Sequence, residues 1–370
     1  MKILHVGEYV QGGVATYIKM LLHHPAENDI EDYLVLAEEK SDHDWPLAAS
    51  HIHYYHYKRS MFGALKTIPR LLRFVREIQP DIIYCHSTWA GVMMRLPYLL
   101  IKKKPKIIYN AHGWAFLRDT ATYKKKIYAW IEKVLSSCTD VIVNVSKYEM
   151  NHAIKYGIPS KKLYLIYSGV PKDGMDEDYS KFDYYDKTKI NLLFVGRFDP
   201  QKGVDLLLQA MKNTKRKDIH LTLIGDNVVG DDYLIKKKNS ENITFLGWIP
   251  HDKLAQYYAN CDAVVMPSRW EAFGLVAVEA MKYAKAVIAS KNGALPELII
   301  NDVNGLIVDF KVDNILEIFP KGKRDYRQMG SMGKEIYIKM FTADNMLNNT
   351  MKCYKYFAKD NAVDKDFNEH

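Results

Sequence analysis

Short apolar runs rich in β-branched residues alternate with longer segments of helical spacing along almost the whole chain. Five such runs lie in the first part of the sequence: 2–7, 81–87, 106–113, 140–146 and 162–169. Six more follow: 191–196, 220–225, 242–247, 262–267, 286–290 and 305–309. The pattern predicts buried strands joined by helices, and therefore parallel sheets covered on both faces.

The helical segments carry apolar residues three or four positions apart. In one of them Leu71, Leu72, Val75 and Ile78 fall on one side. Proline is tolerated in the first turn of a helix, so we expect Pro69 to stand in the first turn here.

A polar stretch, 171–189, interrupts this alternation with turn residues and no clear period. With 370 residues the chain is long for a single core, so two domains are expected. The predicted organisation is a first domain over 1–170, a linker over 171–189 and a second domain over 190–345. From 346 to 370 we expect a helix that packs back towards the first domain, and then a frayed polar tail.

The two predicted domains begin alike. "LHVGEYVQGGVATYIKML" and "LFVGRFDPQKGVDLLLQAM" each contain a strand ending in Val-Gly, a loop that reaches a further Gly-Val, and a helix. The likeness predicts two Rossmann-like units. Ligands of open parallel sheets bind beyond the carboxyl ends of the strands, so both loops are expected to face one interdomain cleft.

Charge is unevenly distributed. Between Tyr54 and Leu135 there are 16 Lys or Arg against four Asp or Glu, which leaves the rest of the chain with 36 basic and 40 acidic residues. A basic region on an otherwise acidic protein indicates an anionic partner such as a membrane, a nucleic acid or a phosphorylated substrate. A merely solvated face is the alternative.

The remaining composition is that of an ordinary globular protein, with 48% hydrophobic and 26% charged residues. No stretch approaches the ~18 apolar residues of a membrane span, and the first residues turn polar too early for a secretory signal. The four cysteines are scattered without CxxC spacing, which predicts a reduced cytoplasmic chain without structural zinc.

The loop "GRFDPQKG" (196–203) follows a predicted strand and precedes a helix. Arg197 and Lys202 there suit a diphosphate, because a guanidinium fork, an ammonium and a helix N-terminus all favour anions. The spacing is not that of a Walker loop. A solvated turn with two surface cations is the alternative.

Two loops of the first half are further candidates. Gly12 and Gly13 in "VQGGV" allow a backbone to approach a ligand closely, although the spacing is not GxGxxG. His112 in "NAHGW" follows a strand, where it could donate to a sugar hydroxyl or a phosphate. A structural turn and a satisfied histidine are the alternatives.

The stretch "SRWEAFGLVAVEAMKY" (268–283) holds two glutamates. If a helix begins near Gly274, Glu271 lies just before it and Glu279 about five residues inside it. The amides of Phe273, Gly274, Leu275 and Val276 would then be available to an anion or a sugar oxygen. A separation of up to ~12 Å fits poorly with the close carboxylates of a retaining glycosidase. It better suits groups that bind hydroxyls on either side of a diphosphate, as in a nucleotide sugar.

These motifs together resemble the retaining glycosyltransferases of GT-B architecture, family 4. "PSRWEAFGLVAVEAM" is similar to the family's Glu-(seven residues)-Glu signature, and "VGRFDPQKGVDLLLQA" to its donor-phosphate loop. "NAHG", "QGGV" and "FLGWIPHDKLAQYYANCDAVVMPS" stand in the expected order, so the resemblance covers about 2–345.

The resemblance implies a role for each candidate residue. Arg197 and Lys202 would bind the donor diphosphate beside Gly196, and Glu271 would face the transferred sugar with the backbone of Phe273 to Val276. Glu279 would hold the ribose, His112 would lie beside the sugar or acceptor, and Gly12 and Gly13 would border the reacting centre. The base would lie near Gly247, Trp248 and Ile249. Members typically transfer without a metal, so no cofactor is expected.

The implied activity is transfer of a hexose or N-acetylhexosamine from a nucleotide sugar, preferably a UDP-sugar, with retention. The implied setting is bacterial cell-surface polysaccharide biosynthesis. We expect a saccharide acceptor, possibly linked to polyprenyl diphosphate, at the inner face of the cytoplasmic membrane. Basic residues near 58–59, 102–106 and 124–126 would attract that surface. Trp114, Phe116, Tyr123, Tyr128 and Trp130 lie among them, either at the interface or in the core.

Three other classes were weighed. A non-hydrolysing sugar-nucleotide epimerase has the same two-lobed plan but needs no acceptor. A glycogen-phosphorylase-like enzyme would be much longer. A binding protein for nucleic acid or another anionic ligand would explain the basic region but not the two glutamates, so no nucleic acid is expected as a partner.

Overall fold

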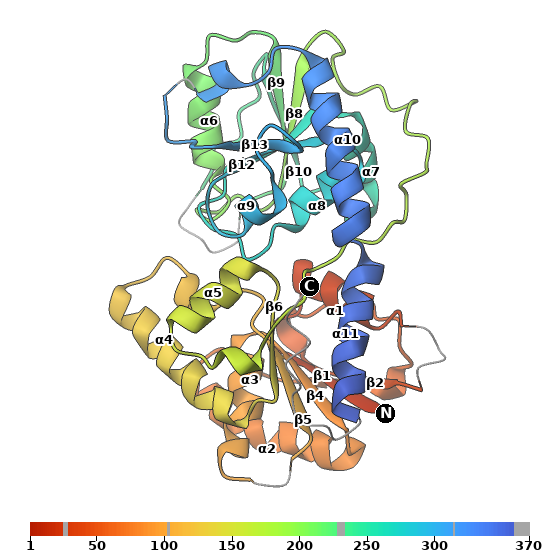
Figure 1. Cartoon of the computed structure of the whole chain (residues 1–370), viewed down its shortest axis with the longest axis vertical. Coiled ribbons are helices and arrows are strands. Elements are labelled where there is room, and N and C mark those ends of the chain that lie inside the picture. Colours follow the sequence, from red (N-terminus) through yellow and green to blue (C-terminus); the bar gives the residue numbers. More distant parts are fainter. Residues whose placement is uncertain (25–28, 102–103, 228–233, 314, 359–370) are drawn as a thin grey trace. The chain divides into compact units, whose positions relative to one another are not determined.

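The computed structural model describes residues 1–24, 29–101, 104–227, 234–313 and 315–358. The chain divides into two compact units, each described by itself (Figure 1). Unit 1 comprises residues 1–168 and the described residues from 344 onward, and unit 2 comprises 169–343. The chain thus leaves unit 1, builds unit 2, and returns to unit 1.

Unit 1 is built on a parallel sheet of seven strands in the order β3-β2-β1-β4-β5-β6-β7. The strands are β1 (Lys2–Gly7), β2 (Glu31–Ala37), β3 (Ile52–Tyr55), β4 (Ile82–His86), β5 (Lys106–Asn110), β6 (Val141–Asn144) and β7 (Leu163–Leu165). The five strands expected here are confirmed, but the sequence analysis missed β2 and β3. The run from Tyr33 to Ala37 has an ordinary strand signal, whereas β3 is a short edge strand of mixed polarity.

Helices cover both faces of this sheet. They are α1 (Gly13–Leu21), α2 (Met61–Ile78), α3 (Thr88–Arg95), α4 (Thr122–Leu135), α5 (Lys147–Lys155) and α11 (Ala343–Ala358). Residues of α2, α3, α4 and α5 share one apolar core with alternate residues of the strands. Figure 1 shows α1 and α11 on the opposite side of the sheet from α3, α4 and α5.

The position of Pro69 differs from the expectation. It lies inside α2, because the helix begins earlier, where the Ser60 hydroxyl accepts a hydrogen bond from the amide of Gly63 at 2.9 Å. The buried residues of α2 continue the apolar stripe on both sides of Pro69: Ala64, Thr67, Leu71, Val75 and Ile78. This N-cap and the packing of the stripe outweigh the one amide that proline removes.

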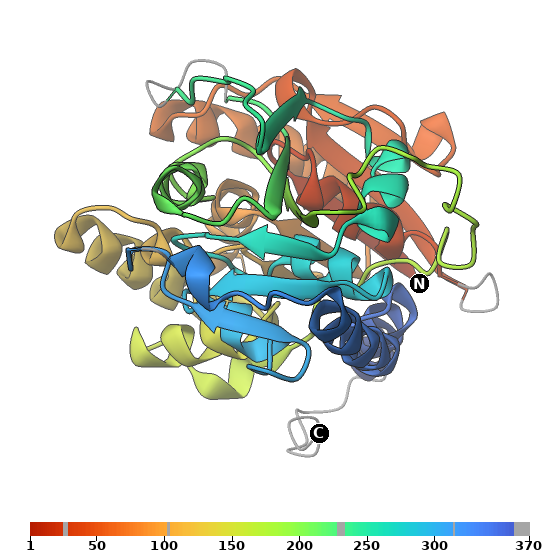
Figure 2. The ribbon, with the colours of Figure 1, turned by 90° about the horizontal axis from the view of Figure 1, so that it is seen from above.

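Unit 2 is built on a parallel sheet of six strands in the order β10-β9-β8-β11-β12-β13, and the six strands expected are confirmed. They are β8 (Ile190–Val195), β9 (Ile219–Ile224), β10 (Ile243–Gly247), β11 (Ala263–Met266), β12 (Ala286–Ser290) and β13 (Gly305–Val308). The helices are α6 (Val204–Asn213), α7 (Ala255–Asn260), α8 (Leu275–Lys282), α9 (Leu295–Leu298) and α10 (Lys323–Met340). Figure 2 shows α6 on one side of the sheet and α7 and α10 on the other.

The polar stretch 171–189 forms part of unit 2. Its aromatic residues pack on α7: the rings of Phe182 and Tyr257 lie 4.9 Å apart, and the hydroxyl of Tyr185 donates to the carbonyl of Tyr257 at 3.2 Å. Tyr185 is buried. The stretch is therefore ordered by aromatic contacts that its polar composition conceals.

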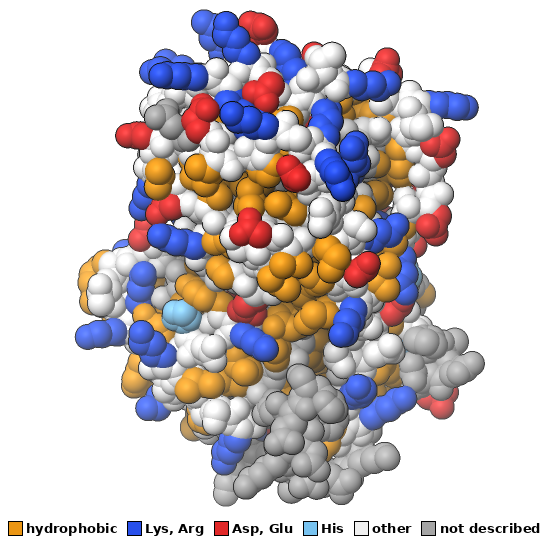
Figure 3. Space-filling view, turned by 45° about the horizontal axis from the view of Figure 1, so that its top comes forward, with side chains coloured by type: hydrophobic (Ala, Val, Ile, Leu, Met, Phe, Trp, Pro, Cys, Tyr) orange, Lys and Arg blue, Asp and Glu red, His pale blue; other side chains and the backbone are white. Residues whose placement is uncertain are grey.

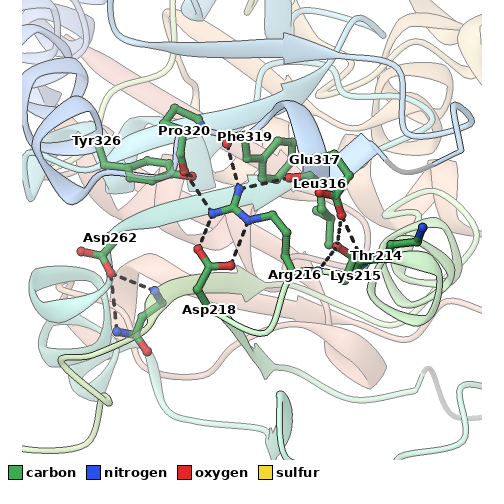
Figure 4. Close-up of polar contacts among 11 residues, drawn as sticks. Thr214, Lys215, Arg216, Asp218, Asp262, Leu316, Glu317, Phe319, Pro320 and Tyr326 are labelled. Atoms are coloured by element: carbon green, nitrogen blue, oxygen red, sulfur yellow. Dashed lines mark hydrogen bonds and ion pairs between the residues drawn. The ribbon is translucent and has the colours of Figure 1, made fainter.

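A buried cation stabilises the end of this sheet where the strands begin (Figure 4). The guanidinium of Arg216 binds both carboxylate oxygens of Asp218, and it donates to the carbonyls of Leu316 and Phe319 at 3.3 and 2.8 Å. Because protein acceptors surround it, Arg216 joins the start of β9 to the segment before α10, and this role is structural.

Candidate functional site

Two loops of unit 2 meet because their strands are neighbours. β8 and β11 pair in parallel, so the loops that follow them leave the sheet at the same edge. The amide of Arg269 donates to the carbonyl of Gln201 at 2.7 Å, and the side-chain amide of Gln201 donates to the carbonyl of Trp270 at 3.1 Å. The two predicted donor loops therefore form one surface.

Two glycines permit this close approach. Gly203 has φ 69°, and a Cβ there would lie 2.2 Å from the carbonyl oxygen of Pro267. Gly293 has φ 67°, and a Cβ there would lie 2.3 Å from the carbonyl oxygen of Glu271. A side chain at either position would push a loop away, so the glycines fix the backbone around Glu271.

Lys202 and Glu271 are in direct contact. The ammonium of Lys202 lies 2.6 Å from Oε1 of Glu271, and the hydroxyl of Ser268 donates to the same oxygen at 2.9 Å. Glu271 is buried and Lys202 is half-buried. Within the described ranges, no partner is recorded for Oε2 of Glu271, so the carboxylate is fixed through one oxygen and presents the other.

Arg197 lies next to this pair through Asp199. The carboxylate of Asp199 binds the guanidinium of Arg197 at 3.0 Å and accepts the amide of Lys202 at 3.0 Å. Asp199 is buried, whereas the side chain of Arg197 is 57% exposed. The two predicted phosphate ligands thus belong to one loop, with Arg197 extending into solvent.

The second helix of the signature begins where it was expected. Gly274 has φ 111° and caps α8, whose first residue is Leu275. In the described chain, no acceptor is recorded for the amides of Gly274, Leu275 and Val276. Phe273 is buried against the ring of Phe341. The first turn of α8 can therefore donate to an anion or to sugar oxygens.

Glu279 lies inside α8 and has partners of its own. The hydroxyl of Tyr258 donates to Oε2 at 2.6 Å, and Nε2 of His251 lies 3.3 Å from Oε1. The hydrogen bond to Glu279 raises the pKa of His251. The sequence analysis did not single out these two partners, because each is separated from Glu279 by more than twenty residues.

The carboxyl ends of β8, β9 and β10 come very close together. The amide of Gly196 donates to Ile224 at 3.0 Å, and the amide of Gly225 donates to Gly247 at 2.8 Å. A Cβ on Gly225 would lie 1.8 Å from the carbonyl oxygen of Gly196. After Gly247, Trp248 is 71% exposed and Ile249 is half-buried.

The candidates of the first half belong to unit 1. Gly12 has φ 56° and caps α1, which begins at Gly13. His112 follows β5 with φ 48°, and its amide donates to the side chain of Asn110 at 2.8 Å. The ring of Tyr17, one turn into α1, lies 4.7 Å from the ring of His112. The start of α1 and His112 are therefore neighbours.

His112 ends a row of buried polar side chains that the sequence analysis missed. Its Nε2 lies 3.1 Å from Nδ1 of His86, and Nε2 of His86 lies 3.0 Å from Nδ1 of His5. Nε2 of His5 lies 3.1 Å from Asp32, whose other oxygen lies 2.6 Å from Nε2 of His24. The signal was present, because a histidine interrupts each of the apolar runs "KILHVG" and "DIIYCH".

The strand register explains this row. His5 pairs with Tyr84, so His86 is two residues further along β4, and His86 pairs with Asn110, so His112 is two residues further along β5. Residues two apart share a face of a sheet, so each step moves one strand across and two residues towards the carboxyl edge. Burial, and then the neighbouring rings of His5 and His112, lower the pKa of His86 well below its usual value. Burial lowers the pKa of His112 to about 3.

In the ranges that the structure describes, no group of three or more His, Cys, Asp or Glu side chains is arranged to hold a metal ion. No helix in those ranges is long and apolar enough to cross a membrane.

Comparisons with known proteins cover both halves of the chain. Residues 176–335 match the family model described as glycosyl transferases group 1, and residues 11–173 match that described as glycosyltransferase family 4. An uncharacterized 41.2 kDa protein in the cps region of Klebsiella pneumoniae is 33% identical over 366 residues, covering 96% of this chain and all of the relative.

Two further relatives have more informative names. The Escherichia coli UDP-Gal:alpha-D-GlcNAc-diphosphoundecaprenol alpha-1,3-galactosyltransferase is 22% identical over 309 residues, which are 79% of each chain. The crystal structure of Anabaena HepE in complex with UDP superimposes with a TM-score of 0.80 at 19% identity, covering 96% of this chain and all of the other.

The histidine row predicts that stability falls with acid. An unfolded histidine binds a proton near pH 6.5, whereas buried His86 does not, so stability is full above that pH and declines as pH falls below it. We expect a loss of about 1.4 kcal/mol per pH unit for each such histidine. Urea unfolding of unit 1, followed by the fluorescence of buried Trp114, would measure this between pH 7.5 and 5.5.

The matched control uses one substitution at two sites. His86→Gln should reduce the pH slope by about one proton's worth, whereas His43→Gln should keep it, because His43 is exposed. Equal slopes in His86→Gln and the unchanged protein would contradict the assignment of His86 as the source.

Proposed function

The chain belongs to the glycosyl transferases group 1 family, and we propose that it transfers a hexose or N-acetylhexosamine from a UDP-sugar to a saccharide acceptor with retention of configuration. The predicted GT-B fold class is confirmed by the two parallel sheets and by the match to HepE along nearly the whole chain. The donor, the acceptor and the stereochemistry are the proposed part.

The Lys202–Glu271 contact is the observation that carries this proposal. Oε1 of Glu271 already accepts two donors, so Oε2 is the oxygen left to accept from a sugar hydroxyl. The amides at the start of α8 adjoin this carboxylate in sequence. A rigid hydroxyl acceptor beside a cation and unpaired amides suits a sugar attached to a diphosphate.

Arg197 and Lys202 would bind that diphosphate. Asp199 orients both residues from below the loop, and the exposed guanidinium of Arg197 can reach the phosphate oxygens in a bidentate manner. Cations fixed in advance stabilise the negative charge that grows on the leaving group as the glycosidic bond breaks. The leaving phosphate oxygen would then accept the proton of the acceptor hydroxyl on the same face.

Glu279 would hold the ribose. Tyr258 is buried and keeps the carboxylate in place, while exposed His251 is weakly bound at 3.3 Å and can yield to a ribose hydroxyl. The exposed ring of Trp248, at the end of the edge strand β10, is a stacking surface for the base.

The named relative supports a UDP-linked donor and a lipid-linked acceptor. Its name states that it uses UDP-galactose and an acceptor on diphosphoundecaprenol. The Klebsiella relative, named for a cps region, supports a place in capsule or related surface polysaccharide synthesis. We propose the same classes of donor and acceptor for this chain, with no metal required.

The outer face of α4 offers a surface for such an acceptor's membrane. Tyr123, Ile127, Trp130 and Val134 are exposed at helical spacing. Lys124, Lys125 and Lys126 lie among them. Figure 3 shows basic side chains beside hydrophobic ones on unit 1. Apolar and basic side chains on one helix face suit an anionic bilayer.

Other residues first considered for this surface have different places. Trp114 and Phe116 belong to the core, and Tyr128 is half-buried. Lys104 binds Asp140 at 2.7 Å, and Arg59 binds buried Glu8 through two nitrogens. Residues 102–103 lie outside the described ranges. The proposed membrane contact therefore rests on α4.

Loss of one phosphate ligand should slow transfer. We expect Lys202→Ala and Arg197→Ala each to lower turnover by ~10²-fold or more, measured with the UDP-sugar that best raises the melting temperature. Lys217→Ala, a change at an exposed lysine of unit 2, should keep the original rate. Product formed without any acceptor would favour an epimerase, and full activity after removal of metals by EDTA is expected.

The two glutamates should differ in their kinetic effects. Glu271→Gln should lower kcat, because it removes the charge beside the transferred sugar. Glu279→Gln should mainly raise KM for the donor, because the ribose does not react. Initial rates over a range of donor concentrations separate the two, and the reverse result would exchange the roles.

The surface of α4 should govern vesicle binding. Ile127→Ser should weaken sedimentation with vesicles containing about a third anionic lipid by several-fold, and added salt should weaken it further. Ile318→Ser, at an exposed isoleucine of unit 2, is the matched control and should change nothing. Equal binding by both variants would contradict a membrane role for α4.

A further inference from the structure

The histidine row in unit 1 has a direction, because its members cannot all donate. A neutral imidazole has one N–H donor and one acceptor nitrogen, so each ring passes its polarity to the next. The protonation of one end therefore determines the tautomer at the other. The row runs from Asp32 through His5 and His86 to His112, so Asp32 decides where the proton of His112 lies.

Asp32 is the fixed end. Burial raises the pKa of its carboxyl, but the hydrogen bonds from His5 and then His24 outweigh burial, and the pKa is lowered. An ionised carboxylate only accepts, so Nε2 of His5 and Nε2 of His24 must both carry protons.

One carboxylate balances one imidazolium, and the geometry assigns that charge to His24. Its contact with Asp32 is 2.6 Å against 3.1 Å for His5, and its side chain is 11% exposed against 1%. A charge costs less where water can reach it. His5 is then neutral, with its proton on Nε2 and its lone pair on Nδ1.

The polarity now follows ring by ring. Nδ1 of His5 accepts, so Nε2 of His86 donates, and Nδ1 of His86 accepts in turn. Nε2 of His112 must therefore donate to His86. Within the described chain, no partner is recorded for Nδ1 of His112, which is half-buried.

We propose that Asp32, His5 and His86 are positioning residues that hold His112 in one tautomer, with the proton on Nε2 and Nδ1 presented as an acceptor for a substrate hydroxyl. This inference rests on the proposed function, and it narrows the ligand of His112. The sequence allowed a donor to either a hydroxyl or a phosphate, but a bare Nδ1 repels phosphate and accepts from a hydroxyl.

The other titratable groups against the row stay neutral and do not compete for its proton. Burial raises the pKa of Tyr17 on α1 to about 12 and that of Tyr84 on β4 well above its usual value. On α11, burial raises the pKa of Cys353 to about 12 and that of Tyr354 well above its usual value. Only a proton placed on His5 would reverse the row and make Nδ1 of His112 a donor.

The decisive experiment reads the tautomer directly. Protein labelled with ¹⁵N in histidine is examined at pH 7.5 by two-bond proton–nitrogen correlation, and the His112 signals are identified by their loss in His112→Gln. We expect Nδ1 of His112 to have the shift of an unprotonated nitrogen and Nε2 that of a protonated one. A proton on Nδ1, or a rapidly exchanging mixture, would overturn the proposal without the need for any variant in the row.

A matched pair of variants tests the role of Asp32. Asp32→Asn offers His5 an amide that can donate, so a population of His112 with its proton on Nδ1 should appear, and kcat should fall ~10-fold or more, as for a wrong tautomer. Asp44→Asn, at a fully exposed side chain of the same unit, should keep both the tautomer and the rate. An unchanged His112 tautomer in folded Asp32→Asn would overturn the inference.

The two levels of proposal fail separately. If no nucleotide sugar supports transfer, the proposed function falls, whereas the tautomer of His112 is still decided by the spectrum. If transfer occurs and the spectrum shows Nδ1 protonated, the function stands and the positioning role of Asp32, His5 and His86 is wrong.

Discussion

The parallel pairing of β8 with β11 is the constraint on which the site in unit 2 depends. It places two loops, separated by more than sixty residues of sequence, at one edge of the sheet, where Lys202 meets Glu271. Neither loop would have its present shape alone, because Gly203 and Gly293 are needed to let the backbones approach. The chemistry of the carboxylate thus follows from strand order and from two missing side chains.

The fold was largely predictable because both periodicities are strong. Buried parallel strands read as continuous apolar runs, and eleven of the thirteen strands were expected from such runs. β3 could not be expected with the same confidence of pattern, since an edge strand of four residues with polar side chains lacks that signal. Pro69 misled the prediction because a local preference was overridden by the cap at Ser60 and by tertiary packing.

The site was predictable in its residues but not in its pairings. The motifs gave Lys202, Glu271 and Glu279, and the start of α8 at Leu275 agrees with the expectation from Gly274. The bond between Lys202 and Glu271, the partners of Glu279, and the row behind His112 all depend on strand order. A single sequence does not reveal strand order, although the parity of His5 and His86 within their strands shows that each has one defined face.

The path of the chain through the two units has a consequence for synthesis. Unit 2 is one continuous segment, so it can fold as soon as its residues leave the ribosome. Unit 1 is interrupted, and α11 covers the sheet beside Tyr84 only after all of unit 2 has been made. Until then the face that carries the histidine row is without this helix, and its buried polar groups are open to water. The unit translated first is therefore the one completed last, so a nascent chain can hold a folded donor loop before its histidine row is sealed.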